Sequence, residues 1–74
     1  MKPMNRDDEH LRIGTELAER RKQMGKTQSD LTDATGVQRN HISRIEQGRY
    51  SVGFDTLQAI ADALDADIRI VPRQ

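Results

Sequence analysis

"TQSDLTDATGVQRNHISRIEQGR", residues 27–49, contains the starting and ending signals of two short helices. Thr27 and Asp30 form a T-x-x-D pattern, in which the hydroxyl and the carboxylate bind free backbone amides at a helix start. Gly36 and Gly48 stand where a helix is expected to end, because glycine adopts the left-handed conformation without a steric penalty. The stretch therefore predicts two helices close together, over residues 28–35 and 38–47.

The second of these helices has two chemically different sides. At about 100° per residue, Ile42 and Ile45 fall on one side as an apolar anchor. The other side carries Asn40, Ser43, Arg44 and Gln47, with Arg39 at the flank. Guanidinium and amide groups can make paired hydrogen bonds to guanine and adenine in a DNA major groove. A polar side is also what solvation alone produces on a surface helix, so both interpretations stay open at this point.

The flanking sequence predicts two more helices and a tail of different period. Acidic residues favour a helix start near residue 8, and apolar residues then recur at helical intervals as far as Gly25: Leu11, Leu17, Ala18 and Met24. A fourth helix is expected over residues 54–64, with an apolar stripe of Phe54, Leu57, Ile60, Ala61 and Leu64. In residues 67–71, isoleucine alternates with charged residues, which indicates a β-strand. We therefore expect a mobile arm (1–7), a helical domain (8–64) and a tail (65–74).

Composition limits the class of protein. The chain has 74 residues, 34% of them hydrophobic, and no net charge, so one small domain is expected. It contains no cysteine and no apolar run of about 20 residues, which predicts a soluble, cytoplasmic protein without disulfides, thiolate metal sites or a membrane span. His10 and His41 are isolated and no glycine-rich phosphate loop occurs, so we expect no metal, no cofactor and no enzymatic activity. Basic residues gather in 36–49 and acidic residues in 54–67.

Several motifs together resemble the phage repressor/Cro-like (Xre-like) helix-turn-helix family over residues 13–64. The matching residues are Gly25, Thr27, Gln28, Leu31, Gly36, Val37, "ISRIEQG" at 42–48 and "LQAIADAL" at 57–64. The resemblance implies an all-α fold, a compact lambda-repressor-like four-helix domain that binds double-stranded DNA. The tail pattern adds a short C-terminal β-strand to this expectation.

The resemblance also implies roles for individual residues. Arg39, Asn40 and Arg44 are expected to contact bases, with Gln38 and Gln28 as further candidates. Gln28, Ser43 and Arg49 are expected to contact phosphates. Arg21 and Glu46 occupy the positions of a structural ion pair that ties the third helix to the first.

Three residues depart from the family's pattern. Thr32 replaces an alanine where the second and third helices approach closely, so their crossing is expected to differ slightly. Gln38 replaces a serine or threonine cap, which weakens the third helix start by about 0.5–2 kcal/mol if nothing compensates. Asp65 replaces a glycine at the end of the fourth helix.

The tail raises the question of oligomeric state. A lone strand leaves its backbone unpaired, so we hypothesise that Ile68, Arg69, Ile70 and Val71 pair antiparallel with a second copy, as in antitoxin-type repressors with similar endings. Such a homodimer would read a palindromic operator with half-sites about 34–36 Å apart. The alternative is a tail that frays or folds back on its own domain.

The functional hypothesis is a dimeric repressor, and the antitoxin of a toxin–antitoxin pair is one form that it could take. The other class of function is a protein-interaction module that binds a toxin or another subunit and binds DNA only weakly.

Overall fold

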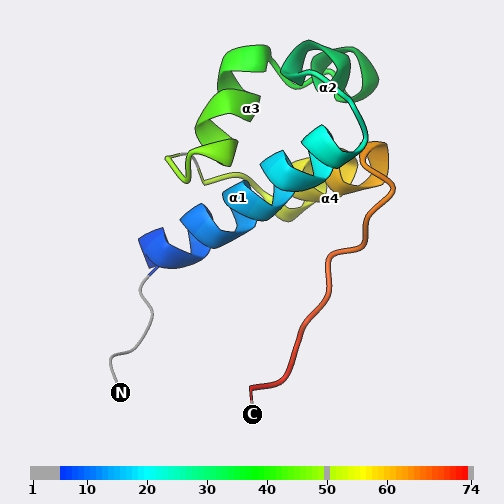
Figure 1. Cartoon of the computed structure of the whole chain (residues 1–74). Helices are drawn as coiled ribbons and strands as arrows, with labels where there is room; N and C mark the ends of the chain where they lie inside the picture. Colours follow the sequence, from blue (N-terminus) through cyan, green and yellow to red (C-terminus); the bar gives the residue numbers. More distant parts are fainter. Residues whose placement is uncertain (1–5, 50, 74) are drawn as a thin grey trace.

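The structure, a computed structural model, describes residues 6–49 and 51–73 and contains four helices there (Figure 1). They are α1 (Arg6–Gln23), α2 (Gln28–Thr35), α3 (Arg39–Glu46) and α4 (Phe54–Ala63). The predicted all-α helix-turn-helix arrangement is confirmed, with helix ends within two residues of those expected. The largest difference is at the amino end, where α1 begins at Arg6, a residue expected in the arm. Residues 1–5 of that arm lie outside the described residues.

The core lies where α2, α3 and α4 meet the inner side of α1. Its buried side chains are Leu31, Ile42, Ile45, Ile60, Ala61 and Leu64, and no polar or charged residue is buried among the described residues. Half-buried Leu17, Met24, Val37 and Val52 pack around them. The anchor role expected for Ile42 and Ile45 is therefore confirmed, since they are 1% and 5% exposed. Both buried apolar side chains of α3 lie on one side of the helix.

Two residues of the predicted apolar stripes are exposed and not buried. Phe54 was expected in the apolar stripe of α4 but is 63% exposed, and Leu11 of α1 is 52% exposed. Phe54 is the first residue of α4, so it lies at the helix end and not against the core. Leu11 lies where the backbone of α1 approaches the residues after α3, so that its backbone is covered while its side chain faces outward.

Gly14 sets how closely α1 approaches α3. A Cβ atom at Gly14 would lie 2.1 Å from the backbone oxygen of Ile45 and 2.9 Å from that of Glu46. Gly48, just after α3, faces α1 in the same way, because its Cβ would lie 2.6 Å from Cα of Leu11. Its φ of +73° adds a second reason for glycine at that position. The carboxyl end of α3 therefore rests directly on the backbone of α1.

The helix ends follow the sequence signals. Thr27 and Asp30 form the predicted capping box at the start of α2, with the Thr27 Oγ1 accepting from the Asp30 amide at 3.0 Å and Asp30 Oδ2 accepting from the Thr27 amide at 2.8 Å. Gly36 ends α2 with φ +78°. Gln38 starts α3 without any side-chain capping bond, as its departure from the family pattern predicted. Asp65, which stands where glycine is usual, adopts φ +50° after α4.

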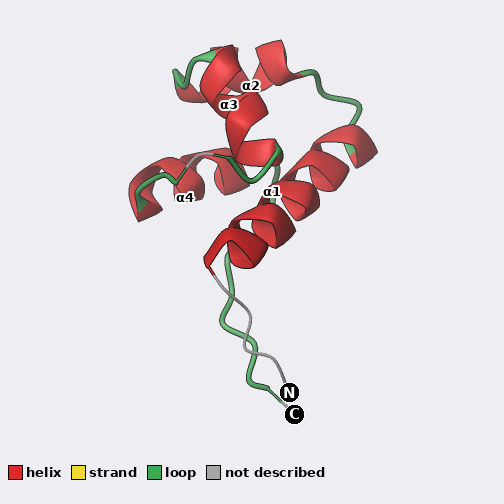
Figure 2. Ribbon diagram, turned by 90° about the vertical axis from the view of Figure 1, so that its left-hand side faces the viewer, coloured by secondary structure: helices red, strands yellow, loops and turns green. Residues whose placement is uncertain are grey.

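The predicted C-terminal β-strand is not present: within residues 66–73 the structure has no strand. The tail is instead an extended segment that leaves the end of α4 and runs away from α2 and α3, as both views of the chain show (Figures 1 and 2). A strand is defined by pairing, and a single extended segment in one copy has no neighbouring strand to pair with.

Basic side chains of α1 and the following turn fix the point where the tail begins. Arg20 donates to the backbone oxygen of Leu64 at 2.9 Å and to that of Asp65 at 3.3 Å. Lys26 donates to the backbone oxygen of Ala63 at 2.9 Å. The last carbonyls of a helix lack partners within it and carry partial negative charge, so cationic donors suit them. These bonds hold the end of α4 against α1 and set the direction of the tail.

Candidate nucleic-acid interface

The candidate interface is the outer side of α3, opposite its buried isoleucines. Arg39, Asn40 and Arg44 are exposed and make no side-chain hydrogen bond or ion pair with another residue in the described part of the chain. Their donors and acceptors are therefore available to an external partner. The sequence assigned these three to base reading, and the structure brings them together on one exposed surface of one short helix.

The helix start adds a fourth candidate. Gln38 is exposed at the N-cap position of α3, with extended backbone angles (φ −61°, ψ 145°). Because its side chain does not cap the helix, its amide is not used there. It adjoins a polar hollow of about 300 Å³ between the start of α3 and the loop before α4, lined also by Val37, Ser51 and Thr56.

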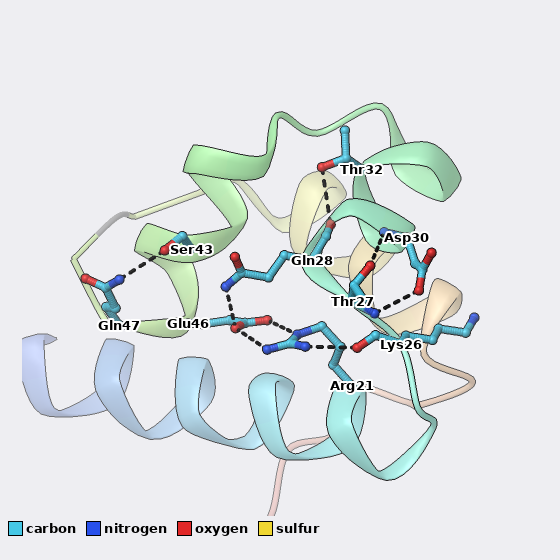
Figure 3. A network of polar contacts seen from close by, with 9 residues as sticks. All are labelled: Arg21, Lys26, Thr27, Gln28, Asp30, Thr32, Ser43, Glu46 and Gln47. Carbon is cyan, nitrogen blue, oxygen red and sulfur yellow. Dashed lines mark hydrogen bonds and ion pairs between the residues drawn. The ribbon is translucent and has the colours of Figure 1, made fainter.

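The Arg21–Glu46 ion pair holds the opposite end of α3 (Figure 3). Arg21 Nε lies 2.7 Å from Glu46 Oε2, and Arg21 Nη2 lies 3.0 Å from Oε1, which makes a two-pronged contact between α1 and α3. The two side chains are only 12% and 8% exposed. The hydrogen bond to Glu46 raises the pKa of Arg21 above its ordinary value, so the guanidinium stays charged. The geometry is that of the structural ion pair that the resemblance implied.

The same ion pair reaches two further elements. Arg21 Nη1 donates to the backbone oxygen of Lys26 at 2.9 Å, in the turn between α1 and α2. Gln28 Nε2, in the first turn of α2, donates to Glu46 Oε1 at 3.0 Å. One carboxylate therefore connects α1, α2 and α3, as Figure 3 shows. Such a connection fixes how α3 sits relative to α2, which is what a helix that enters a DNA groove requires.

Gln28 has a role that sequence reasoning did not include. The sequence predicted that Gln28 contacts DNA. In the structure its half-buried side chain donates a hydrogen bond from the amide nitrogen to Glu46. A carboxylate only accepts hydrogen bonds, so the nitrogen must face Glu46 and the carbonyl oxygen must face away from it. One N–H and the carbonyl oxygen of Gln28 remain for another partner. The spacing of Gln28 and Glu46 in the sequence gives no signal of this contact.

The remaining phosphate candidates lie at the end of α3. Ser43 is half-buried, and its Oγ accepts a hydrogen bond from Gln47 Nε2 at 3.0 Å, which leaves its own hydroxyl hydrogen to donate. Arg49 is exposed, and its amide donates to the backbone oxygen of Arg44 at 2.9 Å. That bond closes the turn after α3 and keeps Arg49 next to it. Both residues border the surface formed by the base-reading candidates.

Charged side chains are divided unevenly among the elements. The exposed arginines Arg39, Arg44 and Arg49 belong to α3 and the turn after it, and α2 lies beside α3 (Figure 2). The acidic residues of α4 and the tail, Asp55, Asp62, Asp65 and Asp67, are exposed on the rest of the molecule. These charges favour contact of a polyanion with α3 and disfavour contact with α4. The tail also carries the exposed Arg69 and Arg73, which offset Asp65 and Asp67.

The described residues contain no cluster of three or more histidine or acidic side chains placed to hold a metal ion. None of their helices has the length and apolar character needed to cross a membrane.

Comparison with known proteins agrees with this geometry. A profile of a family described as helix-turn-helix matches residues 17–71. The chain is 30% identical over 60 residues to the ImmF control region 10 kDa protein of Bacillus phage phi105, a match that covers 81% of this chain and 67% of the phage protein. It is 42% identical over 50 residues to an uncharacterized HTH-type transcriptional regulator of Methanothermobacter thermautotrophicus, covering 68% and 72% of the two chains.

The fold and the profile match place the protein in the class of helix-turn-helix domains. The chain belongs to the phage repressor/Cro-like (Xre-like) family of this class, the family whose motifs its sequence resembles.

Proposed function

We propose that this protein is a sequence-specific regulator of transcription that inserts α3 into the major groove of double-stranded DNA. The observation that carries the proposal is the division of α3 into two sides: Ile42 and Ile45 are buried, and the unpaired polar side chains lie opposite. An α-helix fits the width of the major groove, and the base edges there present a distinct hydrogen-bonding pattern for each base pair.

The proposed base readers are Arg39, Asn40 and Arg44, with Gln38 at the helix start as a further candidate. A guanidinium can bind O6 and N7 of guanine together, and an amide can bind N6 and N7 of adenine. Gln28 can add a contact through its free N–H while its other N–H stays on Glu46. In this proposal Gln28 both orients α3 and touches DNA.

Phosphate contacts are proposed for Arg49 and Ser43, and for the second N–H of Gln28. These contacts would set the position of the protein on the duplex without reading sequence. Arg49 follows α3 and is exposed, so it can reach the backbone strand at the edge of the groove.

The proposed active form is a homodimer that reads a palindromic operator and acts as a repressor. A twofold-symmetric protein presents two copies of α3, and half-sites one helical turn apart place both in the same face of the DNA. The tail is the proposed dimer contact, because Ile70 is 97% and Val71 is 79% exposed in one copy. Burial of these side chains against a second copy removes apolar surface from water.

A second candidate function is a protein-interaction module, of which an antitoxin that binds both a toxin and DNA is one case. The observation that favours it is the exposed surface of α4, where Phe54 is 63% exposed beside the acidic Asp55. An exposed aromatic ring next to a carboxylate suits a basic protein partner better than it suits DNA.

Selection of bound duplexes from a random library, followed by titration at several salt concentrations, tests the proposed function. A specific regulator should prefer one palindrome to random duplex by at least about 10³-fold and should lose affinity steeply with salt. Arg44→Ala should cost about 1–3 kcal/mol at one base pair and relax the choice there. Arg49→Ala should weaken binding to all sequences alike.

The matched control is Arg12→Ala, which also removes one positive charge. Arg12 lies on α1, where it pairs with Glu9 and Glu16 at the surface, and its loss should leave the base preference unchanged. Equal losses on every sequence for Arg44→Ala and Arg49→Ala would contradict the proposed division between base and phosphate contacts. Binding without any sequence preference would favour the protein-interaction module.

A further inference from the structure

Residues 67–70 of the tail alternate between charged and apolar side chains. In an extended segment, alternate residues face the same way, so Ile68 and Ile70 share one side and Asp67 and Arg69 share the other. The structure agrees, because Arg69 Nη2 lies 3.7 Å from Asp67 Oδ2. These two charged side chains are 79% and 78% exposed, so each is free to exchange this contact for one with another chain.

We propose that two tails pair antiparallel in one particular register, with Ile68 facing Ile68 of the partner subunit across the twofold axis. The inference rests on the proposed dimer and adds which residues meet. Residues that face each other across an antiparallel pair point to the same side of the ribbon. In a twofold-symmetric pair this is possible only if one residue faces its own copy at the axis. Within the proposed strand, residues 67–71, three such registers pair at least three residues of each chain: those centred on Ile68, Arg69 or Ile70.

Charge selects the register centred on Ile68. In that register each Asp67 faces the partner's Arg69, so two opposite-charge pairs form and Ile70 faces the partner's Ala66. Centring on Arg69 places two guanidinium groups directly opposite each other, which is unfavourable. Centring on Ile70 leaves Arg69 facing an apolar valine and places Ile68 against a proline, which has no N–H to donate.

The backbone of Ala66 is compatible with the same register. Its amide already donates to the backbone oxygen of Ala61 at 2.9 Å, so it is not available to a partner strand. In an antiparallel ladder, hydrogen-bonded and non-hydrogen-bonded residue pairs alternate. If the Ala66 pair is non-hydrogen-bonded, the Ile68 pair is too, and the two Asp67–Arg69 pairs make the inter-chain hydrogen bonds. The Ala66 amide then keeps its bond to Ala61 and needs no acceptor in the partner strand.

The helices give this ribbon a surface to pack on. A two-stranded ribbon is at best marginally stable alone, and packing against helices is what usually supports it. A groove of about 310 Å³ runs between the tail and the α1–α4 surface. Its lining is mixed: apolar Ile13, Leu17, Leu57 and Ala61, charged Arg12, Glu16 and Arg20, and from the tail Ala66, Asp67, Ile68, Arg69 and Val71. Ile68 is 39% exposed there, whereas Ile70 does not line the groove and is 97% exposed. A ribbon centred on Ile68 therefore has its central apolar pair beside the groove.

Single-cysteine crosslinking of the full chain tests the register, because the natural sequence contains no cysteine. In the proposed register the Cα atoms of position 68 in the two chains lie about 4.5 Å apart, within disulfide range. Position 69 of the two chains is then more than about 7 Å apart and position 70 about 14 Å apart, both too far. Equilibration with oxidised and reduced glutathione should crosslink Ile68→Cys at least about tenfold more than Arg69→Cys or Ile70→Cys.

A charge exchange gives a second test that needs no disulfide. Asp67→Arg and Arg69→Asp should each weaken the homodimer about tenfold, because each turns both cross-strand pairs into like charges. Mixing these two variants should restore dimers as heterodimers, and the double variant should restore the homodimer.

The outcomes separate this inference from the proposed dimer. If light scattering finds the natural chain monomeric at high micromolar concentration, the tail-mediated dimer is wrong and this inference fails with it. If the natural chain is dimeric and truncation after residue 65 makes it monomeric, but Arg69→Cys or Ile70→Cys crosslinks best, only the register is wrong. The same conclusion holds if mixing the two charge variants restores no dimer.

Discussion

Replacement of Gly14 by alanine should separate α1 from α3 and destabilise the domain. The added Cβ would lie 2.1 Å from the backbone oxygen of Ile45, whereas ordinary contacts begin at 3.4 Å, so the two helices must move apart by 1.3 Å (3.4 − 2.1) along that direction. The obstacle is backbone, which cannot rotate away as a side chain can. Overpacking of this kind costs about 1–3 kcal/mol, and a shift of the backbone places the cost at the upper end.

Helix propensity acts in the opposite direction, because alanine is favoured over glycine within a helix by about 1 kcal/mol. The net expectation is a loss of about 1–2 kcal/mol, which corresponds to a fall in Tm of about 4–16 °C for a domain of this size. Thermal unfolding followed by circular dichroism measures it. Thr15→Ala, at the next and exposed position of α1, is the control for propensity and should be neutral or slightly stabilising. A Gly14→Ala protein as stable as the natural one would refute the close approach of the two backbones.

Three further substitutions test the rest of the scaffold. Glu46→Gln removes the charge facing Arg21, whose side chain is only 12% exposed. Urea titrations should show a free energy of unfolding lower by about 3 kcal/mol, the lower end of the range for broken buried pairs. A loss under about 0.5 kcal/mol would mean that the pair contributes no more than an ordinary surface pair. Hydrogen bonding from the Thr27 backbone lowers the pKa of Asp30 in the folded state. The contribution of Asp30 to stability is therefore complete above the unfolded-state pKa and disappears as the pH falls through the folded-state pKa. The stability difference between Asp30→Asn and the natural protein should shrink below about pH 4, and a difference independent of pH would argue against that hydrogen bond. Gln38→Ser supplies the capping oxygen that α3 lacks and should raise Tm, with a gain of about 0.5–1 kcal/mol; an unchanged Tm would mean that the helix start is satisfied in another way.

The helices were predictable from sequence because their signals are local. The capping box at Thr27 and the left-handed glycine at Gly36 depend on residues at most four apart, and both appear in the structure as expected. The burial of Ile42 and Ile45 followed from helical periodicity alone. Local chemistry determines where helices begin and end, and spacing determines which side they bury.

What the sequence did not predict depends on contacts between distant residues. Gly14 and Ile45 meet only because α1 crosses α3, and a glycine inside a helix gives no indication of its neighbour. The contact of Gln28 with Glu46 is of the same kind. The exposure of Phe54 was missed because the periodicity of an apolar stripe does not show where its contact with the core ends. The β-strand was over-predicted because alternation marks a segment able to pair and does not supply the second strand.

The base-reading roles of Arg39, Asn40 and Arg44 stay predictions, since they concern a partner that only an experiment can supply. Their common exposure on one side of α3 makes them testable as a group. None of these three side chains takes part in the Arg21–Glu46 ion pair that holds α3 on α1, so stability and DNA binding can be measured with separate variants.

The insertion of α3 into DNA is tested most directly by nuclear magnetic resonance of the labelled protein during titration with its selected duplex. If α3 enters the major groove, the side-chain signals of Arg39, Asn40 and Arg44 should shift or broaden, while those of Ile42 and Ile45 keep the pattern of a packed core. If signals of α4 and the tail move while those on the exposed side of α3 stay unchanged, α3 is not the DNA-reading element and the proposed function is wrong.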